Sequence, residues 1–214
     1  MSGERRVEGL YFVADDDPRW RCDPVSQARA ALAGGARMVQ LRAKHSRDAQ
    51  ALAWAEAIGA ACRAHGALFF VNDRFDLALA AGADGVHLGQ DDLPPARLPA
   101  PARAQLLVGR STHTLEQARA ARDEGVDYVA FGPVFGTASK DSPYPARGLA
   151  ALAEAARQVA PRPLVAIGGI DAARAAAALR AGAAAVCAIS AVAGADDMEA
   201  AARALVGAIP GGRG

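Results

Sequence analysis

Gly34-Gly35-Ala36-Arg37-Met38-Val39-Gln40 is a stretch whose pattern returns three more times along the chain. The other copies are Ala81-Gly82-Ala83-Asp84-Gly85-Val86-His87, Glu124-Gly125-Val126-Asp127-Tyr128-Val129-Ala130 and Ala181-Gly182-Ala183-Ala184-Ala185-Val186-Cys187. In each copy an amphipathic stretch rich in alanine ends at a glycine, which enters the left-handed conformation at little cost and commonly stops a helix. The apolar run that follows is typical of a strand covered on both faces, as in a parallel sheet. The repeat therefore predicts a series of helix-to-strand units.

Apolar runs predict strands at 9–13, 38–42, 68–71, 85–88, 106–109, 128–131, 163–167 and 184–189. Helical patterns between and after them predict helices at 26–33, 48–65, 75–81, 115–124, 148–160, 172–181 and 198–206. Thr114, Asp171 and Asp197 stand where helix N-caps are expected. The proline-rich segment between Asp91 and Gln105 leaves room for a short helix or an irregular connection.

Strands that alternate with helices through 214 residues predict an α/β fold, a single-domain (β/α)8 TIM barrel. We expect one domain over 1–214 with its core at about 8–208 and frayed ends, since no linker composition interrupts the chain. The alternative is an open doubly wound sheet, which normally carries a glycine-rich loop after its first strand. Here that position reads Asp15-Asp16-Asp17, which favours the barrel.

Composition limits the partners of the chain. A net charge of +1 offers no footprint for nucleic acid or a membrane surface, and no apolar run is long enough to span a bilayer. The cysteines Cys22, Cys62 and Cys187 lack metal-ligand spacing, so we expect reduced thiols and a cytoplasmic location. The expected partners are small molecules, and a homo-oligomer is compatible with this composition.

Function in a TIM barrel lies where the strands end, and the second expected strand carries cations there. Strand alternation places Gln40, Arg42 and Lys44 on one side, facing the mouth of the barrel. Two cations at that point favour an anionic ligand. The alternative for Arg42 is an ion pair with a nearby aspartate.

Asp73 and Asp92 follow neighbouring expected strands, so the two carboxylates can meet at the rim. Like charges repel unless a cation lies between them, and Mg²⁺ accepts carboxylate oxygens together with water and phosphate oxygens. The alternative is that Asp73 caps the following helix. With Arg42, Lys44 and Lys140 on the same rim, the two carboxylates indicate a site for a metal diphosphate.

The loop after the sixth expected strand carries Thr137, Ser139 and Lys140, whose hydroxyl and ammonium groups can bind phosphate oxygens. The segment 137–147 is long enough to act as a lid, and a plain surface loop is the alternative. Gly168-Gly169 and Ile189-Ser190 follow the last two strands. TIM barrels often bind phosphate at that place, so we expect a second anion site there.

Two histidines also follow strands. His113 could act as an acid or base, and the alternative is a local hydrogen bond at the start of a helix. We expect His87 to be packed behind the site, and we assign Tyr128 no role beyond packing.

Five ordered motifs between about residues 8 and 205 resemble the thiamine-phosphate synthase family. They are Val39-Gln40-Leu41-Arg42-Ala43-Lys44, Val71-Asn72-Asp73-Arg74, His87-Leu88-Gly89-Gln90-Asp91-Asp92-Leu93, the segment from Gly132-Pro133-Val134-Phe135 to Ser139-Lys140, and Ala166-Ile167-Gly168-Gly169-Ile170. Ser139 stands where the family commonly has threonine, which keeps a hydroxyl. A sister group of thiazole tautomerases shares the scaffold.

The resemblance implies a transferase that joins 4-amino-2-methyl-5-hydroxymethylpyrimidine diphosphate to a thiazole phosphate, or its carboxylated form, and releases diphosphate in a dissociative step assisted by Mg²⁺. It implies that Asp73 and Asp92 carry the Mg²⁺ and that Gln40 and Ser111 orient the pyrimidine. The residues implied for the diphosphate are Arg42, Lys44, Asn72, Ser139 and Lys140. Those implied for the thiazole phosphate are Gly168, Gly169, Ile189 and Ser190, with Thr137 nearby. Arg42, Ser111 and Lys140 are the implied catalytic residues.

Two alternatives stay open at this point. The first is a thiazole tautomerase-like isomerase, which needs no metal and would depend on His113. The second is a phosphate-binding barrel without catalytic activity.

Overall fold

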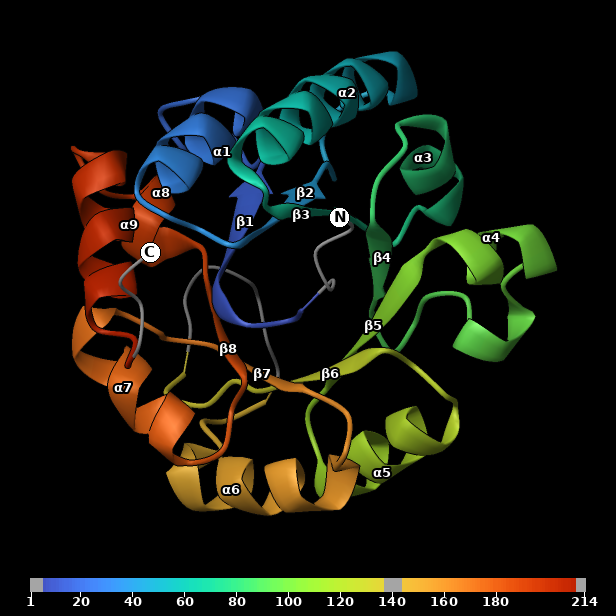
Figure 1. Cartoon of the computed structure of the whole chain (residues 1–214), viewed down its shortest axis with the longest axis vertical. Coiled ribbons are helices and arrows are strands. Elements are labelled where there is room, and N and C mark those ends of the chain that lie inside the picture. The colour runs from blue at the N-terminus through green and yellow to red at the C-terminus, as the bar shows by residue number, and fades with distance from the viewer. Residues whose placement is uncertain (1–5, 137–143, 211–214) are drawn as a thin grey trace.

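The computed structural model describes residues 6–136 and 144–210, and in these residues eight parallel strands form a closed barrel. The strands are β1 (Gly9–Asp15), β2 (Met38–Arg42), β3 (Leu68–Asn72), β4 (Gly85–Leu88), β5 (Leu107–Thr112), β6 (Tyr128–Phe131), β7 (Leu164–Ile167) and β8 (Ala185–Ala188). Each strand pairs with the next in sequence, and the pairing of β8 with β1 closes the ring. Figure 1 looks into this ring, with the helices around it. The predicted TIM barrel is confirmed and the open sheet is excluded.

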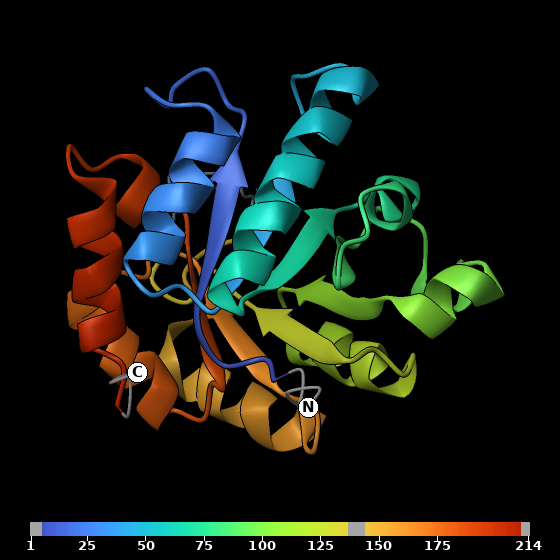
Figure 2. The ribbon, with the colours of Figure 1, turned by 45° about the horizontal axis from the view of Figure 1, so that its top comes forward.

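The helices of the described chain form the outer layer around the strands (Figure 2). They are α1 (Pro24–Ala33), α2 (Asp48–His65), α3 (Phe75–Ala80), α4 (Ala100–Gln105), α5 (Leu115–Asp123), α6 (Gly148–Val159), α7 (Ala172–Arg180), α8 (Ser190–Ala193) and α9 (Met198–Gly207). Thr114, Asp171 and Asp197 each accept a hydrogen bond from a backbone N–H of the first turn, which confirms the predicted caps. The short helix α8 was not predicted, because a single turn shows no amphipathic period.

Strands β1 and β5 run further toward the mouth of the barrel than the apolar pattern predicts. Asp15 pairs with Arg42 of β2, and Ser111 and Thr112 pair with Ala130 and Phe131 of β6. A polar residue interrupts the apolar pattern in the sequence, but its backbone can still pair with the next strand. The predicted ends of β1 at 13 and of β5 at 109 are therefore wrong. The consequence is that Asp15 and Ser111 are held on rigid strands.

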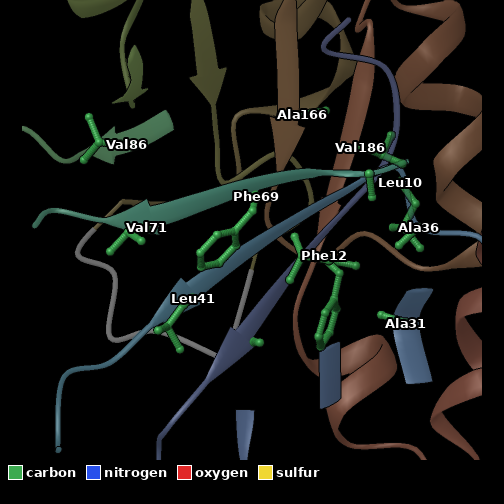
Figure 3. Packing of buried hydrophobic residues seen from close by; sticks show 14 of the residues in the cluster. Leu10, Phe12, Ala31, Ala36, Leu41, Phe69, Val71, Val86, Ala166 and Val186 are labelled. Carbon is green, nitrogen blue, oxygen red and sulfur yellow. The ribbon is translucent and has the colours of Figure 1, made fainter. Parts of the chain in front are cut away.

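Alternation along the strands creates two separate apolar cores. Side chains that point outward, among them Leu10, Phe12 and Phe69, pack between the barrel and the helices (Figure 3). Side chains that point inward form a smaller core inside the ring, which includes Tyr11 and Val13. The inner core lies directly beneath the polar mouth and forms its floor.

Two glycines make room for aromatic rings inside the barrel. A Cβ atom at Gly85 would lie 2.4 Å from the Phe70 ring, and one at Gly109 would lie 2.1 Å from the Tyr128 ring. The centroids of these two rings are 5.5 Å apart at an interplanar angle of 81°, an edge-to-face contact. Tyr11 contacts both rings, at 5.5 Å and 6.0 Å. The barrel can therefore hold three large rings in its centre.

The cysteines agree with the prediction of free thiols. Cys62 and Cys187 are buried and Cys22 is exposed, and none of the three forms a disulfide in the described residues. Burial raises the pKa of the Cys62 thiol to about 12. Over the ranges 6–136 and 144–210, no helix combines the length and apolar character needed to cross a bilayer.

Replacing Gly109 with alanine should destabilise the barrel by about 1–3 kcal/mol, because the new methyl group overlaps the Tyr128 ring. The matched control is Gly207→Ala, since nothing lies within 4 Å of a Cβ at that position of α9. The control should be neutral or stabilising by up to about 1 kcal/mol. Urea unfolding measures both values, and equal stability of the two variants would contradict this account of the barrel interior.

Candidate active site

The inward-facing side chains become polar where the strands reach the mouth of the barrel. Asp15, Gln40 and His87 are buried there, whereas Asn72 and Ser111 are partly exposed. Asn72 is the last residue of β3 and pairs in register with His87 of β4. The barrel thus places a ring of polar groups directly above its apolar inner core.

Arg42 forms an ion pair with Asp15 across the β1–β2 pair. Its Nη1 atom donates to both carboxylate oxygens of Asp15, at 3.0 and 3.1 Å, and Asp15 is 1% exposed. This pairing confirms the alternative that the sequence left open for Arg42. A guanidinium carries five N–H donors, so a contact through Nη1 leaves others to bind an anion in the mouth.

Lys44, Asp73 and Asp92 form a second charged cluster on the rim. The Lys44 ammonium is paired with Asp73, and the Asp73 and Asp92 carboxyl groups share a hydrogen bond. Burial and the neighbouring Asp92 raise the pKa of Asp73. Burial also acts to raise the pKa of Asp92, but hydrogen bonds from Asp73 and from the Gly89 N–H outweigh it, so that the pKa of Asp92 is lowered. Each of the two carboxyl groups therefore affects the ionisation of the other.

The backbone holds Asp73 in an unusual conformation. Its φ angle is +63°, in the left-handed region that residues other than glycine rarely adopt. The Asp73 N–H donates to the His87 carbonyl at 2.8 Å, which ties the residue to β4. The predicted alternative that Asp73 caps a helix is wrong, because the N-cap of α3 is Arg74 and its side chain makes no capping bond.

A metal ion at Asp73 and Asp92 would rely on ligands from outside the protein. Within the described ranges no group of three or more His, Cys, Asp or Glu side chains is arranged to hold a metal. The two carboxylates would supply two positions, and water or a bound phosphate would supply the rest, which is the usual arrangement for Mg²⁺. The donor set therefore fits a metal that binds together with a phosphorylated ligand.

A row of hydrogen bonds crosses the floor of the site from β2 to β5. Gln40 Nε2 donates to the Tyr11 hydroxyl at 2.7 Å, and the Tyr11 and Tyr128 hydroxyls are 2.9 Å apart. The Tyr128 hydroxyl lies 2.8 Å from His87 Nδ1, and His87 Nε2 lies 2.8 Å from Ser111 Oγ. The expectation that His87 is packed behind the site is confirmed. Gln40 and Ser111, the residues that the resemblance assigns to the pyrimidine, are the two ends of this row.

The roles of Tyr11 and Tyr128 were missed in the sequence. Both phenols are buried, and their pKa values are raised above the ordinary value, chiefly by burial. A tyrosine in the middle of a buried strand needs a hydrogen-bond partner for its hydroxyl, and this requirement is the signal that could have found them. Tyr11 and Tyr128 therefore contribute hydrogen bonds to the floor of the site in addition to their packing in the inner core.

Gly168 and Gly169 follow β7 at the place predicted for a second anion site. Their φ angles are +97° and +65°. A Cβ at Gly168 would lie 2.5 Å from Pro133, and one at Gly169 would lie 2.3 Å from the Gly136 carbonyl oxygen. A side chain at either position would clash with the loop after β6, so both glycines also allow this loop to lie close to β7. That structural role was not predicted.

The strand pairing brings the two halves of this predicted anion site to the same edge. Ile167 of β7 pairs in register with Cys187 of β8, so Gly168-Gly169 and Ile189-Ser190 leave the barrel side by side. Ser190 begins the short helix α8. Thr137, Ser139 and Lys140 lie outside the described residues, as does most of the predicted lid at 137–147.

His113 is engaged locally. Its Nδ1 atom lies 2.7 Å from the Gly132 carbonyl oxygen, and its ring stacks on Tyr144 with centroids 4.1 Å apart. Its backbone N–H donates to Gln117 in the first turn of α5. The local hydrogen bond weighed as an alternative for this residue is confirmed.

Known proteins with similar sequences and structures point to one family. A sequence model described as thiamine monophosphate synthase matches residues 10–192. The thiamine-phosphate synthase of Anaeromyxobacter dehalogenans is 53% identical over 210 residues, which cover 97% of this chain and 90% of the relative. The thiamine-phosphate synthase of Thermus thermophilus is 46% identical over 199 residues, which cover 92% of this chain and 94% of the relative.

A solved structure gives the same result. The thiamine phosphate pyrophosphorylase from Pyrococcus furiosus superposes with a TM-score of 0.84 at 34% identity, over 96% of this chain and 97% of that one. The family model covers all five motifs of the resemblance and most of the barrel. The chain belongs to the thiamine monophosphate synthase family.

Proposed function

We propose that the chain joins an aminopyrimidine diphosphate to a thiazole phosphate, producing thiamine phosphate and diphosphate. As a member of its family the chain is a transferase. The observation that carries the proposal is the charged rim at the mouth, where Lys44 pairs with Asp73 of the Asp73–Asp92 carboxyl pair and Arg42 pairs with Asp15. This combination suits a diphosphate that arrives with a divalent cation.

The reaction requires the diphosphate to leave with its bonding electrons, so negative charge grows on the leaving group. Arg42 and Lys44 can stabilise that charge. Because both cations are already held in place at a partly buried site, little solvent has to reorganise as the charge develops. Mg²⁺ bound at Asp73 and Asp92 would supply further neutralisation of the leaving group. The resemblance assigns the same task to Asn72, Ser139 and Lys140.

The floor of the barrel suits the pyrimidine ring. Gln40 and Ser111 offer polar groups on opposite sides of an apolar surface that includes Val13 and Ile189. The thiazole phosphate is proposed to bind near Gly169 and Ser190, at the ends of β7 and β8. This arrangement would place the thiazole nitrogen near the carbon that loses diphosphate, and no nucleophilic side chain is required.

Turnover of the purified chain with both substrates tests the proposal. We expect thiamine phosphate to form in the presence of Mg²⁺ and its formation to stop when a chelator is added, because the diphosphate charge is then left unneutralised. Chromatography of the products measures the reaction, and excess Mg²⁺ should restore it. Equal rates with and without chelator would contradict the metal assignment.

Asp92→Asn should reduce kcat/KM by about a hundredfold or more, because the amide cannot neutralise a metal ion. The matched control is Asp91→Asn, an exposed neighbour that makes the same chemical change one residue away. Steady-state assays at several Mg²⁺ concentrations compare the two variants. A similar loss in both would show that charge on this loop, and not a specific ligand, is what matters.

His113→Ala should change kcat/KM by less than about tenfold, because the ring is bonded to a backbone carbonyl and stacked on Tyr144. A histidine that transfers a proton in the rate-limiting step would contribute about a hundredfold or more. The same synthase assay measures the effect. A loss of that larger size would favour the isomerase alternative, in which this histidine is essential.

A further inference from the structure

A cavity lies at the end of the barrel opposite the mouth, where the strands begin. Its volume is about 960 Å³, which is large enough for a small organic ligand. It is lined by the start of β1, the turn from α1 to β2, the turn from α7 to β8 and the end of α9. Figure 2 shows β1 rising from this end and α9 returning to it. None of the described residues assigned above to the substrates or the metal lines this cavity.

Arginines dominate the charge of this cavity. Arg37, Arg180 and Arg203 line it, and Glu8 is the only carboxylate among the described residues that do so. Arg203 is paired with Glu199 of the same helix. In the described part of the chain, the guanidinium groups of Arg37 and Arg180 make no hydrogen bond or ion pair. The cavity therefore has two guanidinium groups whose N–H donors can bind an anion.

The barrel fixes the position of Arg37 at this cavity. Its N–H donates to the Leu10 carbonyl at 3.0 Å, and its carbonyl accepts from the Leu68 N–H at 2.9 Å. Its side chain lies over Gly9, where a Cβ atom would be 3.0 Å from Arg37 Cγ. Gly9 also has a φ angle of +79°, which a residue with a side chain rarely adopts. The glycine at the start of β1 thus leaves room for the Arg37 side chain.

Part of the cavity wall is apolar. Leu179, Val206 and Ile209 line the cavity, and each is partly exposed. A bare inorganic anion would leave these side chains in contact with water, whereas the apolar part of an organic ligand would cover them. Guanidinium groups bind phosphate through paired N–H donors. The lining therefore suits a ligand that carries a phosphate group on an apolar or aromatic body.

We propose that this cavity binds an organic phosphate at a second site, separate from the mouth. Arg37 and Arg180 bind the phosphate oxygens, and Leu179, Val206 and Ile209 contact the body of the ligand. The inference goes beyond the proposed function and does not depend on it, because the cavity and the mouth lie at opposite ends of the barrel.

The alternative is that the two arginines serve the fold alone. The helices α1, α7 and α9 end at this side of the barrel, and Arg180 lies in the last turn of α7. The C-terminus of a helix carries partial negative charge, which a nearby cation offsets. If the arginines have only this task, phosphate compounds added to the protein produce no specific effect at the cavity.

NMR titration of the full chain with adenosine 5′-monophosphate locates and measures the binding. This probe carries a phosphate on an aromatic body, and adenosine and inorganic phosphate are its two matched parts. We expect the amide signals of Gly34, Gly35 and Ala184 at the cavity to shift and to saturate. The probe should bind at least about tenfold more tightly than adenosine or inorganic phosphate, because each part lacks one set of contacts.

Two outcomes of this titration overturn the inference. One is the absence of saturable shifts at the cavity, including the case in which only Gly168 and Gly169 at the mouth respond. The other is equal affinity for the probe and for inorganic phosphate or adenosine, which would mean that the cavity does not recognise an organic phosphate as a whole.

Arg37→Gln and Arg180→Gln should each weaken binding of adenosine 5′-monophosphate by about tenfold or more, because each variant removes a charged donor. The matched control is Arg29→Gln on α1, which removes the same charge outside the cavity. All three arginines are exposed, so the variants should fold. The control should keep the wild-type affinity. Unchanged affinity in both cavity variants, or an equal loss in all three variants, would contradict the inference.

Discussion

The hydrogen bond between the Tyr11 and Tyr128 hydroxyls crosses the centre of the barrel, and both the inner core and the floor of the site depend on it. The two oxygens are 2.9 Å apart and fully enclosed. The contact is possible because Gly109 leaves space for the Tyr128 ring. Below it the barrel is apolar, and above it the side chains are polar. A single buried contact thus separates the part of the barrel that stabilises the fold from the part that can bind a ligand.

Much of the fold could be predicted because its signals are local. Apolar runs predicted both ends of β2, β4 and β6 correctly, and the capping residues Thr114 and Asp171 predicted where α5 and α7 begin. The ends of β1 and β5 were predicted too short, since polar residues at a barrel mouth look like loop residues in sequence. The single turn of α8 carries no periodicity at all.

The candidate site could likewise be predicted only in part from the sequence. Strand ends and alternation were sufficient to bring Arg42, Lys44, Asp73 and Asp92 to one rim, because parallel strands present their carboxyl ends together. The partners within the rim could not be read from sequence. That Asp15 binds Arg42, or that Tyr128 contacts His87, depends on which inward-facing side chains meet across the closed ring.

A crystal structure with thiamine phosphate, diphosphate and Mn²⁺ as a stand-in for Mg²⁺ tests the central claim most directly, namely that the charged rim and the polar floor form one site for metal diphosphate and pyrimidine. We predict an anomalous peak between the Asp73 and Asp92 carboxylates, with the pyrimidine ring between Gln40 and Ser111. A metal bound elsewhere, or a pyrimidine ring outside the barrel mouth, would contradict the account.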